Sequence, residues 1–419
     1  MPKYSTPRGT RDFLPEEMNR REKVMEIIRN VYRSYGYDAL ETPALEELGV
    51  LRAKCGEEVE KQLYEITGGK LGMRFDLTVP LARVIASNNS LPKPFKRYCI
   101  SRVWRREEPQ KGRFREFTQA DIDVIGSSSP ACEAELLACA SECLRALGFK
   151  NFKILLNDRR ILDSLLEKFS LTENKNGVTR ALDKLGKISE NDVLKEAEAR
   201  GVPKAKMKQL LEFVTMKGTN VQKLESVKKT APEAVDNMEK LLSLCSAYGL
   251  KETVELSFSL ARGLDYYSST IFEIKASPEI GSIAGGGRYD DLIESYGGAK
   301  TPAVGISFGV DRLMDVLTSI PKQKTFTLLY IATPKETSYN YAVSLAQFFR
   351  SNAIPTQLDL MERNLRKQFD FASSLAIPFV AIAGEKEEKE GKLTLRDMES
   401  GKEELLTKED ALKKLRMTE

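Results

Sequence analysis

The chain has 419 residues, which is too many for one ordinary hydrophobic core, so two or more domains are expected. Hydrophobic residues make up 41% and charged residues 30%, a balance typical of soluble globular proteins and not of disordered chains. The 65 lysine and arginine residues barely exceed the 61 acidic residues, and the formal net charge is +4. Bulk electrostatic attraction to nucleic acid is therefore excluded, and any such contact must come from local patches.

Histidine is absent from the sequence. Its absence excludes Ser-His-Asp and Cys-His catalysis and every zinc site that needs imidazole ligands. The six cysteines form no CxxC pair, and Cys132, Cys139 and Cys143 share one helical face, where a buried core position is favoured over a metal site. The chemistry must therefore use arginine, carboxylate, tyrosine, glutamine and backbone groups.

Neither a signal peptide nor a membrane span is predicted. The first fifteen residues contain no apolar stretch of the kind found in signal peptides. The longest nearly apolar segment, residues 376–383, is far too short to cross a bilayer. We therefore expect a cytoplasmic protein.

The first 150 residues alternate helical and extended patterns. Pro15 opens a helix that Gly36 ends, and "YGYDALETP" then runs extended to Pro43. Residues 99–103 and 121–125 are strand-like and flank the charged turn "EEPQKGR", which predicts an antiparallel hairpin with a long loop. Residues 130–147 form an amphipathic helix that stops at Gly148.

From about residue 160 to residue 248 the pattern is almost entirely helical, which indicates a helical insertion. Strands return at 254–260 and 270–274. Two segments, "SIAGGGRYDDLIESYG" and "AVGISFGVDRLMDVL", then each run from a glycine-bearing strand or turn into a helix. After Pro321, strands at 325–332, 356–360 and 379–383 alternate with helices at 337–351 and 364–376, which predicts a separate α/β unit.

The predicted hairpin carries both signs of charge. Arg102, Arg105 and Arg106 lie on its incoming strand, and Phe117, Gln119, Asp121 and Asp123 on the outgoing strand share one face of the sheet. Such a face suits a zwitterionic or phosphorylated small ligand, whereas the alternative is a salt-bridged surface hairpin. Taken alone, the segment favours the surface hairpin.

Three later segments favour a ligand site. "ARGLDYYSST" places Arg262 and Asp265 beside Tyr266 and Tyr267 directly after an apolar strand. "AGGGRYD" allows a ligand to approach the backbone closely, although a triple glycine is more often a turn. Arg312 lies in the first turn of the helix after "GISFG", where it can bind phosphate, although an exposed ion pair is the usual case.

With these segments the chain resembles the histidyl-tRNA synthetases, a family of class II aminoacyl-tRNA synthetases, over essentially its whole length. "YGYDALETP" is similar to class II motif 1, "RVWRREEPQKGRFREFTQADID" to motif 2 and "GISFGVDRLMDVL" to motif 3. "RGLDYYSSTIFE" and "AGGGRYDDLI" resemble two stretches peculiar to this family and are more specific. "PRGTRDFLP" near the start is a further mark of it.

The resemblance implies which residues bind ATP. Arg105 and Arg262 are expected at the α-phosphate as the catalytic residues, and Arg105 also holds the histidine carboxylate. The expectation is that Arg105, Arg262 and Arg312 converge on one nucleotide. The other implied contacts are Glu107 at the adenine amino group, Arg113 at the distal phosphates, Phe117 beneath adenine, and Arg312 at the γ-phosphate and adenine.

The resemblance also implies the histidine site. Asp76, Leu77 and Thr78 match a strand segment that takes the substrate amino group. A carboxylate at Asp123 can accept one ring N–H while a tyrosine hydroxyl serves the other nitrogen, and we expect Asp123→Ala to abolish histidine activation with little change in stability. The remaining implied histidine contacts are Gln119, Arg262, Tyr266, Tyr267 and Tyr289.

Activation needs no general base, because the attacking histidine carboxylate is already ionised at neutral pH. It needs alignment and stabilisation of charge on the phosphate oxygens, which the arginines and Mg²⁺ arriving with ATP can provide. No tightly bound prosthetic group or metal site is expected.

The resemblance implies an α+β fold. A class II catalytic domain with an antiparallel sheet flanked by helices is expected at 1–160 and 249–320, a helical insertion domain at 161–248, and an anticodon-binding α/β domain at 325–419. Expected partners are L-histidine, ATP, tRNA(His) and a second copy of the chain, bound through motif 1 around Pro43, with no membrane.

Two other classes of function are disfavoured by the sequence. A synthetase-like regulatory paralogue of histidine biosynthesis, which charges no tRNA, is disfavoured because such paralogues lack the C-terminal domain and erode the histidine motif. A pure nucleic-acid-binding module is disfavoured by the small net charge.

Overall fold

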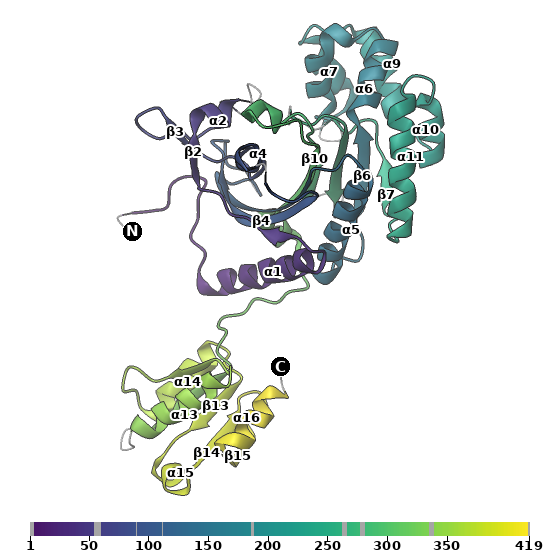
Figure 1. Cartoon of the computed structure of the whole chain (residues 1–419). Helices are drawn as coiled ribbons and strands as arrows, with labels where there is room; N and C mark the ends of the chain where they lie inside the picture. The colour runs from purple at the N-terminus through teal and green to yellow at the C-terminus, as the bar shows by residue number, and fades with distance from the viewer. Residues whose placement is uncertain are drawn as a thin grey trace. The chain divides into compact units, whose positions relative to one another are not determined.

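The computed structural model describes residues 4–53, 60–88, 90–110, 112–185, 188–261, 266–276, 281–334 and 339–417. The chain forms two compact units (Figure 1). The first comprises Met1–Asp12 and Val24–Ile320, and the second comprises Phe13–Lys23 and Pro321–Glu419.

The first unit is built on an eight-stranded sheet with the order β1-β4-β5-β10-β9-β8-β6-β7. Its six central strands pair antiparallel, and only the edge pairs β1·β4 and β6·β7 are parallel. The α+β class with a mainly antiparallel sheet is therefore confirmed. The strands are β1 (Asp38–Ala39), β4 (Phe95–Trp104), β5 (Glu116–Ile125), β6 (Lys153–Asp158), β7 (Val254–Leu256), β8 (Thr270–Lys275), β9 (Ala284–Arg288) and β10 (Ala303–Gly309).

The β4–β5 hairpin is longer than the sequence predicted. Pairing extends from Phe95 opposite Ile125 to Trp104 opposite Glu116, so the incoming strand ends before Arg105 and Arg106. Of the three arginines predicted on that strand, only Arg102 lies within it. The Arg105 N–H still donates to the Arg115 carbonyl at 2.9 Å, so the two chain segments stay close for one residue beyond the end of the strands.

The two faces of this sheet have different roles. One face packs against α1 (Pro15–Ser34) and α5 (Ala131–Ala146), and it buries Ala120, Ile122 and Val124 of β5 in the main core. The other face is covered in part by α4 (Thr78–Ser87), which lies within the curve of the sheet in Figure 1. This second face, on the α4 side, carries the alternate residues of β5 and holds the candidate site.

Helices dominate residues 159–247, as predicted. Their apolar faces join the core that α5 and β6 form, and Figure 1 shows them beyond β6 and β7. They are α6 (Arg159–Lys168), α7 (Lys175–Leu182), α8 (Glu190–Glu198), α9 (Lys204–Val214), α10 (Asn220–Val227) and α11 (Pro232–Ala247), with a 3₁₀ turn at Thr172–Asn174. A two-stranded sheet of β2 (Leu45–Glu47) and β3 (Leu71–Met73) adjoins α2 (Leu48–Arg52). α12 (Val310–Val316) follows β10.

The second unit confirms the predicted α/β alternation. Its sheet has the order β12-β11-β13-β14-β15, with the first three strands parallel and the last two antiparallel. The charged segment after residue 383 is a short helix followed by the predicted hairpin. The elements are β11 (Leu329–Ala332), α13 (Tyr339–Ser351), β12 (Thr356–Leu358), α14 (Leu365–Ser374), β13 (Phe379–Ile382), α15 (Glu385–Glu390), β14 (Lys392–Asp397), β15 (Glu403–Thr407) and α16 (Lys408–Arg416).

A search of the described residues finds no helix long and apolar enough to cross a membrane.

Candidate active site

A row of polar side chains follows β5 on the α4 side of the sheet. Gln119, Asp121 and Asp123 alternate with the core residues of the same strand, and all three are buried. Because residues directly opposite each other in neighbouring strands share a face, Asp123 faces Arg97 of β4 and Asp121 faces Ser307 of β10. The alternation predicted from the sequence is therefore confirmed, and the segment is not a surface hairpin.

Asp123 is held from two sides. Its Oδ2 lies 2.9 Å from Arg97 Nε, and its Oδ1 accepts a hydrogen bond of 2.5 Å from the Tyr289 hydroxyl. Arg97 is itself anchored, because its Nη2 donates to the Leu77 carbonyl at 3.0 Å. The Arg97–Asp123 pair is close, but its geometry is not that of an aligned hydrogen bond, so Oδ2 keeps acceptor capacity. Asp123 is therefore fixed in place with one oxygen available to a ligand.

Three acceptor oxygens on β5 have no hydrogen-bond partner although they are buried. They are Gln119 Oε1, Asp121 Oδ1 and Asp123 Oδ2. The Gln119 amide instead donates through Nε2 to Ser307 Oγ at 2.7 Å. Because unsatisfied buried acceptors are costly, this row requires a ligand that brings several N–H donors.

Burial sets the electrostatics of this row. It raises the pKa of Asp123, which the Arg97 charge and the Tyr289 hydrogen bond counteract. It raises the pKa of Asp121 to about 7, against the lowering influence of Arg97, while Asp123 and Asp76 raise it further. Three carboxylates thus compete for few cations, which favours a positively charged ligand.

Asp76 lies in the turn between β3 and α4, and not in a strand as the sequence predicted. It caps the helix, because its Oδ1 accepts the Val79 N–H at 2.9 Å, and its Oδ2 accepts the Tyr266 hydroxyl at 3.3 Å. Leu77 shares this turn and Thr78 begins α4. The strand expectation was wrong because an aspartate and a threonine four and two residues before Pro80 favour a helix start over an extended chain. Burial raises the pKa of Asp76 and Arg105 lowers it.

Three tyrosines cluster beside these carboxylates. The Tyr266 and Tyr267 ring centroids lie 5.0 Å apart, and those of Tyr266 and Tyr289 lie 6.0 Å apart, both in edge contacts. Two of the hydroxyls bind different carboxylates, since Tyr266 donates to Asp76 and Tyr289 donates to Asp123. Residues 266–268 and 287–290 therefore meet beside the carboxylates Asp76 and Asp123.

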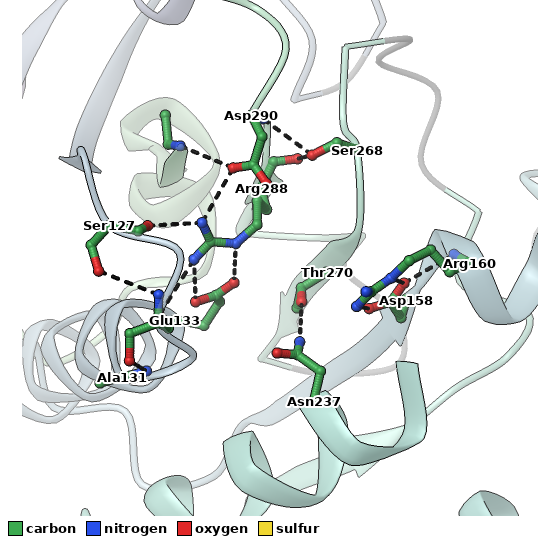
Figure 2. Close-up of polar contacts among 12 residues, drawn as sticks. Ser127, Ala131, Glu133, Asp158, Arg160, Asn237, Ser268, Thr270, Arg288 and Asp290 are labelled. Atoms are coloured by element: carbon green, nitrogen blue, oxygen red, sulfur yellow. Dashed lines mark hydrogen bonds and ion pairs between the residues drawn. The ribbon is translucent and has the colours of Figure 1, made fainter. Parts of the chain in front are cut away.

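Arg288, next to Tyr289 in sequence, forms a network with Glu133, Ser127 and Asp290 (Figure 2). Its guanidinium forms two contacts with the Glu133 carboxylate of α5, at 2.6 and 2.7 Å, and donates to the Ser127 carbonyl at 2.9 Å. The segment 266–268 is tied to the same strand, because the Ser268 N–H donates to the Arg288 carbonyl at 2.8 Å. Asp290 completes the network, which fixes the backbone on both sides of Tyr289.

Glycine creates the space beside Asp123. A Cβ atom at Gly305, directly across from Asp123, would lie 1.9 Å from Asp123 Oδ1. One at Gly287, the next residue in this row, would lie 2.8 Å from the Tyr267 ring. Glycine is thus required by close packing at both positions, and the "AGGGRYD" glycines are more than a turn.

Four of the predicted ATP residues lie at the loop end of the hairpin, and Arg312 lies on α12. The Arg105 guanidinium lies 5.2 Å from the Phe117 ring centroid, and its Nε donates to the Phe75 carbonyl at 3.0 Å. Glu107 and Arg113 approach each other to 3.8 Å within the hairpin loop. Arg312 donates through Nη1 to the Ser282 carbonyl at 2.8 Å.

The N-terminal segment also reaches this region. The Arg115 N–H donates to the Gly9 carbonyl at 2.8 Å, and Arg11 pairs with Asp311 of α12 at 2.7 Å. Asp311 in turn accepts the Thr118 N–H at 2.9 Å. The "PRGTRDF" stretch is therefore part of the scaffold that holds the hairpin against α12.

Two of the residues singled out from the sequence cannot be placed, and two residues of the site were not assigned from the sequence. Arg262 and Asp265 lie outside the described residues, so the convergence of three arginines stays a prediction. Arg97 and Asp121 were not assigned as site residues. Asp121 could have been found from its place on the polar face, whereas Arg97 became visible only through the register of β4 against β5.

No group of three or more histidine, cysteine, aspartate or glutamate residues suited to a metal ion occurs within the part of the chain that is described.

Comparison with known proteins gives a consistent result. The model of the family described as "Histidyl-tRNA synthetase" matches residues 9–313, and the one described as "Anticodon binding domain" matches residues 325–418. The chain is 40% identical over 411 residues to the histidine--tRNA ligase of Aeropyrum pernix, covering 94% of each chain. It is 38% identical over 447 residues to that of Bacteroides fragilis, covering 98% of each.

Solved structures agree with the sequence matches. The histidyl-tRNA synthetase of Nostoc sp. PCC 7120 superimposes with a TM-score of 0.86 at 29% identity over 100% of both chains. A structure titled as an ATP phosphoribosyltransferase regulatory subunit/histidyl-tRNA synthetase from Bacillus halodurans gives 0.75 at 22% identity, covering 91% of this chain and 98% of that one, and shares the fold.

Proposed function

Because the chain belongs to the histidyl-tRNA synthetase family, it is an ATP-dependent ligase that joins histidine to tRNA(His), and we propose that the β5 row and its surroundings form its histidine site. The observation that carries this assignment is the set of three buried acceptor oxygens on Gln119, Asp121 and Asp123 that accept no hydrogen bond within the protein. A histidine molecule brings an ammonium group and ring N–H groups, which are the donors these oxygens lack.

Histidine recognition follows from the acceptors. Asp76 and Gln119, together with Leu77 and Thr78, take the substrate amino group, and Asp123 takes a ring N–H. Tyr289 orients Asp123, and Tyr266 orients Asp76, through the hydrogen bonds described above. Tyr267 packs beside Tyr266 as a wall of the pocket. An apolar analogue would leave these buried groups unpaired and would be rejected strongly.

In this proposal the nucleotide lies over the loop end of the hairpin. Arg105 holds the α-phosphate and the histidine carboxylate, with Arg262 as its proposed partner at the same phosphate. The contact between the Arg105 guanidinium and the Phe117 ring supports this role, because an adenine stacked on that ring would lie next to the guanidinium. Glu107 binds the adenine amino group, Arg113 the distal phosphates, and Arg312 the γ-phosphate and adenine. Mg²⁺ arrives bound to ATP.

Activation is an in-line attack of the histidine carboxylate on the α-phosphorus, which releases pyrophosphate. The carboxylate is ionised at neutral pH and no proton must be removed, so the absence of histidine side chains costs this step nothing. The residues contribute alignment and positive charge at the phosphate oxygens. The tRNA 3′-hydroxyl then attacks the histidyl-adenylate.

The remaining assignments concern partners and domains. We infer that the second unit binds the anticodon, consistent with the family model matched over residues 325–418, and that residues 161–248 form an insertion domain within a catalytic domain of residues 1–160 and 249–320. The proposed location is the cytoplasm, where translation takes place.

A homodimer through motif 1 is proposed from exposed apolar residues near Pro43. Leu45 and Leu71 are 44% and 39% exposed and occupy the same face of the β2–β3 sheet, since Leu45 pairs with Met73 and Glu47 with Leu71. Pro43 is also exposed. Light scattering across protein concentrations tests the dimer, and Leu45→Glu is expected to shift the mass to that of one chain.

The assay for the whole proposal is histidine-dependent exchange of pyrophosphate into ATP, followed by charging of tRNA(His). A regulatory paralogue would not charge tRNA, and the presence of the second unit argues against that alternative. Loss of exchange when histidine is omitted is the expected result. No exchange with histidine present would overturn the assignment.

A further inference from the structure

Asp121 is a buried carboxylate of the proposed histidine site to which no particular group of the substrate has yet been assigned. It lies between Gln119 and Asp123 on the site face of β5 and is 3% exposed. Its Oδ1 has no hydrogen-bond partner. A carboxylate oxygen buried without a partner is costly, so its retention in the floor of a binding site calls for a ligand donor.

The neighbours of Asp121 leave that oxygen available. Ser307 on β10 accepts the Gln119 amide, which frees its own hydroxyl hydrogen for Asp121, and this contact lowers the pKa of Asp121. Arg97 is the cation that most lowers the pKa of Asp121, but its nearest carboxylate contact is with Asp123. Asp121 therefore shares one arginine with Asp123.

Among the described residues, titratable groups face Asp121 from β4, β5, α1 and the turn before α4. Arg97 and Cys99 face it from β4, Asp123 from β5, Asp76 from the turn before α4, and Tyr32 from α1 beneath the sheet. Burial raises the pKa of the Cys99 thiol to about 12 and that of Tyr32 well above its usual value, so both are neutral at pH 7. The charged neighbours are then two carboxylates against Arg97.

Among the described groups beside Asp123, the positions left free for a ligand are acceptors, because the Arg97 Nε–H lies 2.9 Å from Asp123 Oδ2. The Tyr289 hydrogen is used by Asp123, and the free positions are Asp121 Oδ1, Asp123 Oδ2 and the Tyr289 oxygen. A neutral imidazole has one N–H and one bare nitrogen, and the bare nitrogen would face an acceptor. An imidazolium ring has two N–H groups and matches the arrangement.

We propose that Asp121 is a histidine-binding residue, and that Asp121 and Asp123 together bind the substrate side chain as an imidazolium with a proton on both ring nitrogens. This inference rests on the proposed function and specifies the protonation state of its substrate. Free histidine is largely neutral at the ring above pH 7, because imidazole has a pKa near 6.5. Binding at pH 8 must then take up about one proton from solvent, to give a charged ring between two carboxylates.

The measurement is calorimetry of histidine binding at pH 8 in two buffers with different heats of ionisation. Wild-type protein is expected to take up about one proton per histidine, and its dissociation constant is expected to rise about tenfold between pH 7.5 and 8.5. Asp121→Asn keeps the shape and can turn an amide N–H toward a bare ring nitrogen. Its proton uptake is expected to fall to near zero, with a flat pH dependence over the same range.

A second readout needs no variant. Ring-¹⁵N-labelled histidine bound to wild-type protein at pH 8 is expected to show both nitrogens as protonated in the NMR spectrum. One protonated and one bare nitrogen, or equal proton uptake by wild type and Asp121→Asn, would overturn the inference. These outcomes are distinct from failure of the proposed function, which would appear as absent pyrophosphate exchange in wild-type protein.

Discussion

Arg97 and Asp123 face each other across β4 and β5, with 2.9 Å between Arg97 Nε and Asp123 Oδ2 and exposures of 1% and 2%. Asp123 thus has a structural partner as well as a proposed ligand. Burial costs both charges their hydration, and each reduces that cost for the other. A substitution at Asp123 must therefore affect folding and activity together.

Asp123→Ala is expected to abolish histidine-dependent pyrophosphate exchange and to lower the free energy of unfolding by about 3–5 kcal/mol, because Arg97 stays buried without its partner. This replaces the sequence-based expectation of little change in stability, which did not take the buried Arg97 into account. Urea unfolding and exchange assays check the two effects. As a control, Arg97→Met combined with Asp123→Leu should recover stability without activity. A double variant destabilised as much as Asp123→Ala would contradict the explanation by the ion pair.

Gly305→Ala is expected to raise the KM for histidine strongly, because its Cβ would lie 1.9 Å from Asp123 Oδ1 and would displace that carboxylate. Gly49→Ala in α2 is the matched control, since nothing lies within 4 Å of its added Cβ and its φ is not in the left-handed region. That control is expected to leave KM unchanged and to stabilise by up to about 1 kcal/mol. Equal effects of the two alanines on KM would refute the packing argument.

Much of the fold could be predicted because its signals are local. The alternation along β5, the helix from Pro15 and the α/β pattern after Pro321 each depend on residues close in sequence. The Arg97–Asp123 pair could not be predicted, because it depends on strand register across a long loop. The same holds for Arg288, whose partner Glu133 lies 155 residues away on α5.

Arg288 is expected to act as a positioning residue for Tyr289. Arg288→Lys keeps one positive charge but loses the two-point contact with Glu133, so the backbone around Tyr289 should become less well fixed. We expect the KM for histidine to rise about 10-fold or more while the KM for ATP changes little. Steady-state exchange assays separate the two constants. A purely structural role would lower the melting temperature and leave both KM values unchanged.

Tyr289→Phe tests the hydrogen bond itself. Removing the hydroxyl takes away a donor to a charged acceptor, an interaction worth about 1.5–3 kcal/mol, so histidine binding should weaken roughly 10- to 100-fold. The same bond lowers the pKa of Asp123, so its loss raises that pKa further. Calorimetric titration with histidine measures the change. Tyr330→Phe in the second unit removes a comparable tyrosine–aspartate hydrogen bond, with Asp359, and should leave histidine affinity unaltered.

The raised pKa of Asp121 predicts how the free energy of unfolding depends on pH in the protein without ligand. Burial raises its pKa from 3.8 to about 7, so the folded protein holds this proton more tightly than the unfolded chain. Its contribution to stability is therefore fully present below about pH 4 and is lost as the pH rises to about 7. The lost stabilisation is on the order of 4 kcal/mol.

Asp121→Asn should remove this dependence, because an amide does not titrate. At pH 8 the variant is expected to be more stable than wild type, and near pH 4 the two should differ little. Urea unfolding at both pH values measures the difference. Asp76 and Asp123, whose pKa values are also raised by burial, remain in both proteins, so comparing wild type with the variant isolates the effect of Asp121.

The ionised Asp121 carboxylate destabilises the free protein near pH 8, and a cationic substrate ring offsets that destabilisation when it binds. Saturating histidine should therefore stabilise wild-type protein more than the variant at pH 8, and equal stabilisation of both would contradict the role of Asp121.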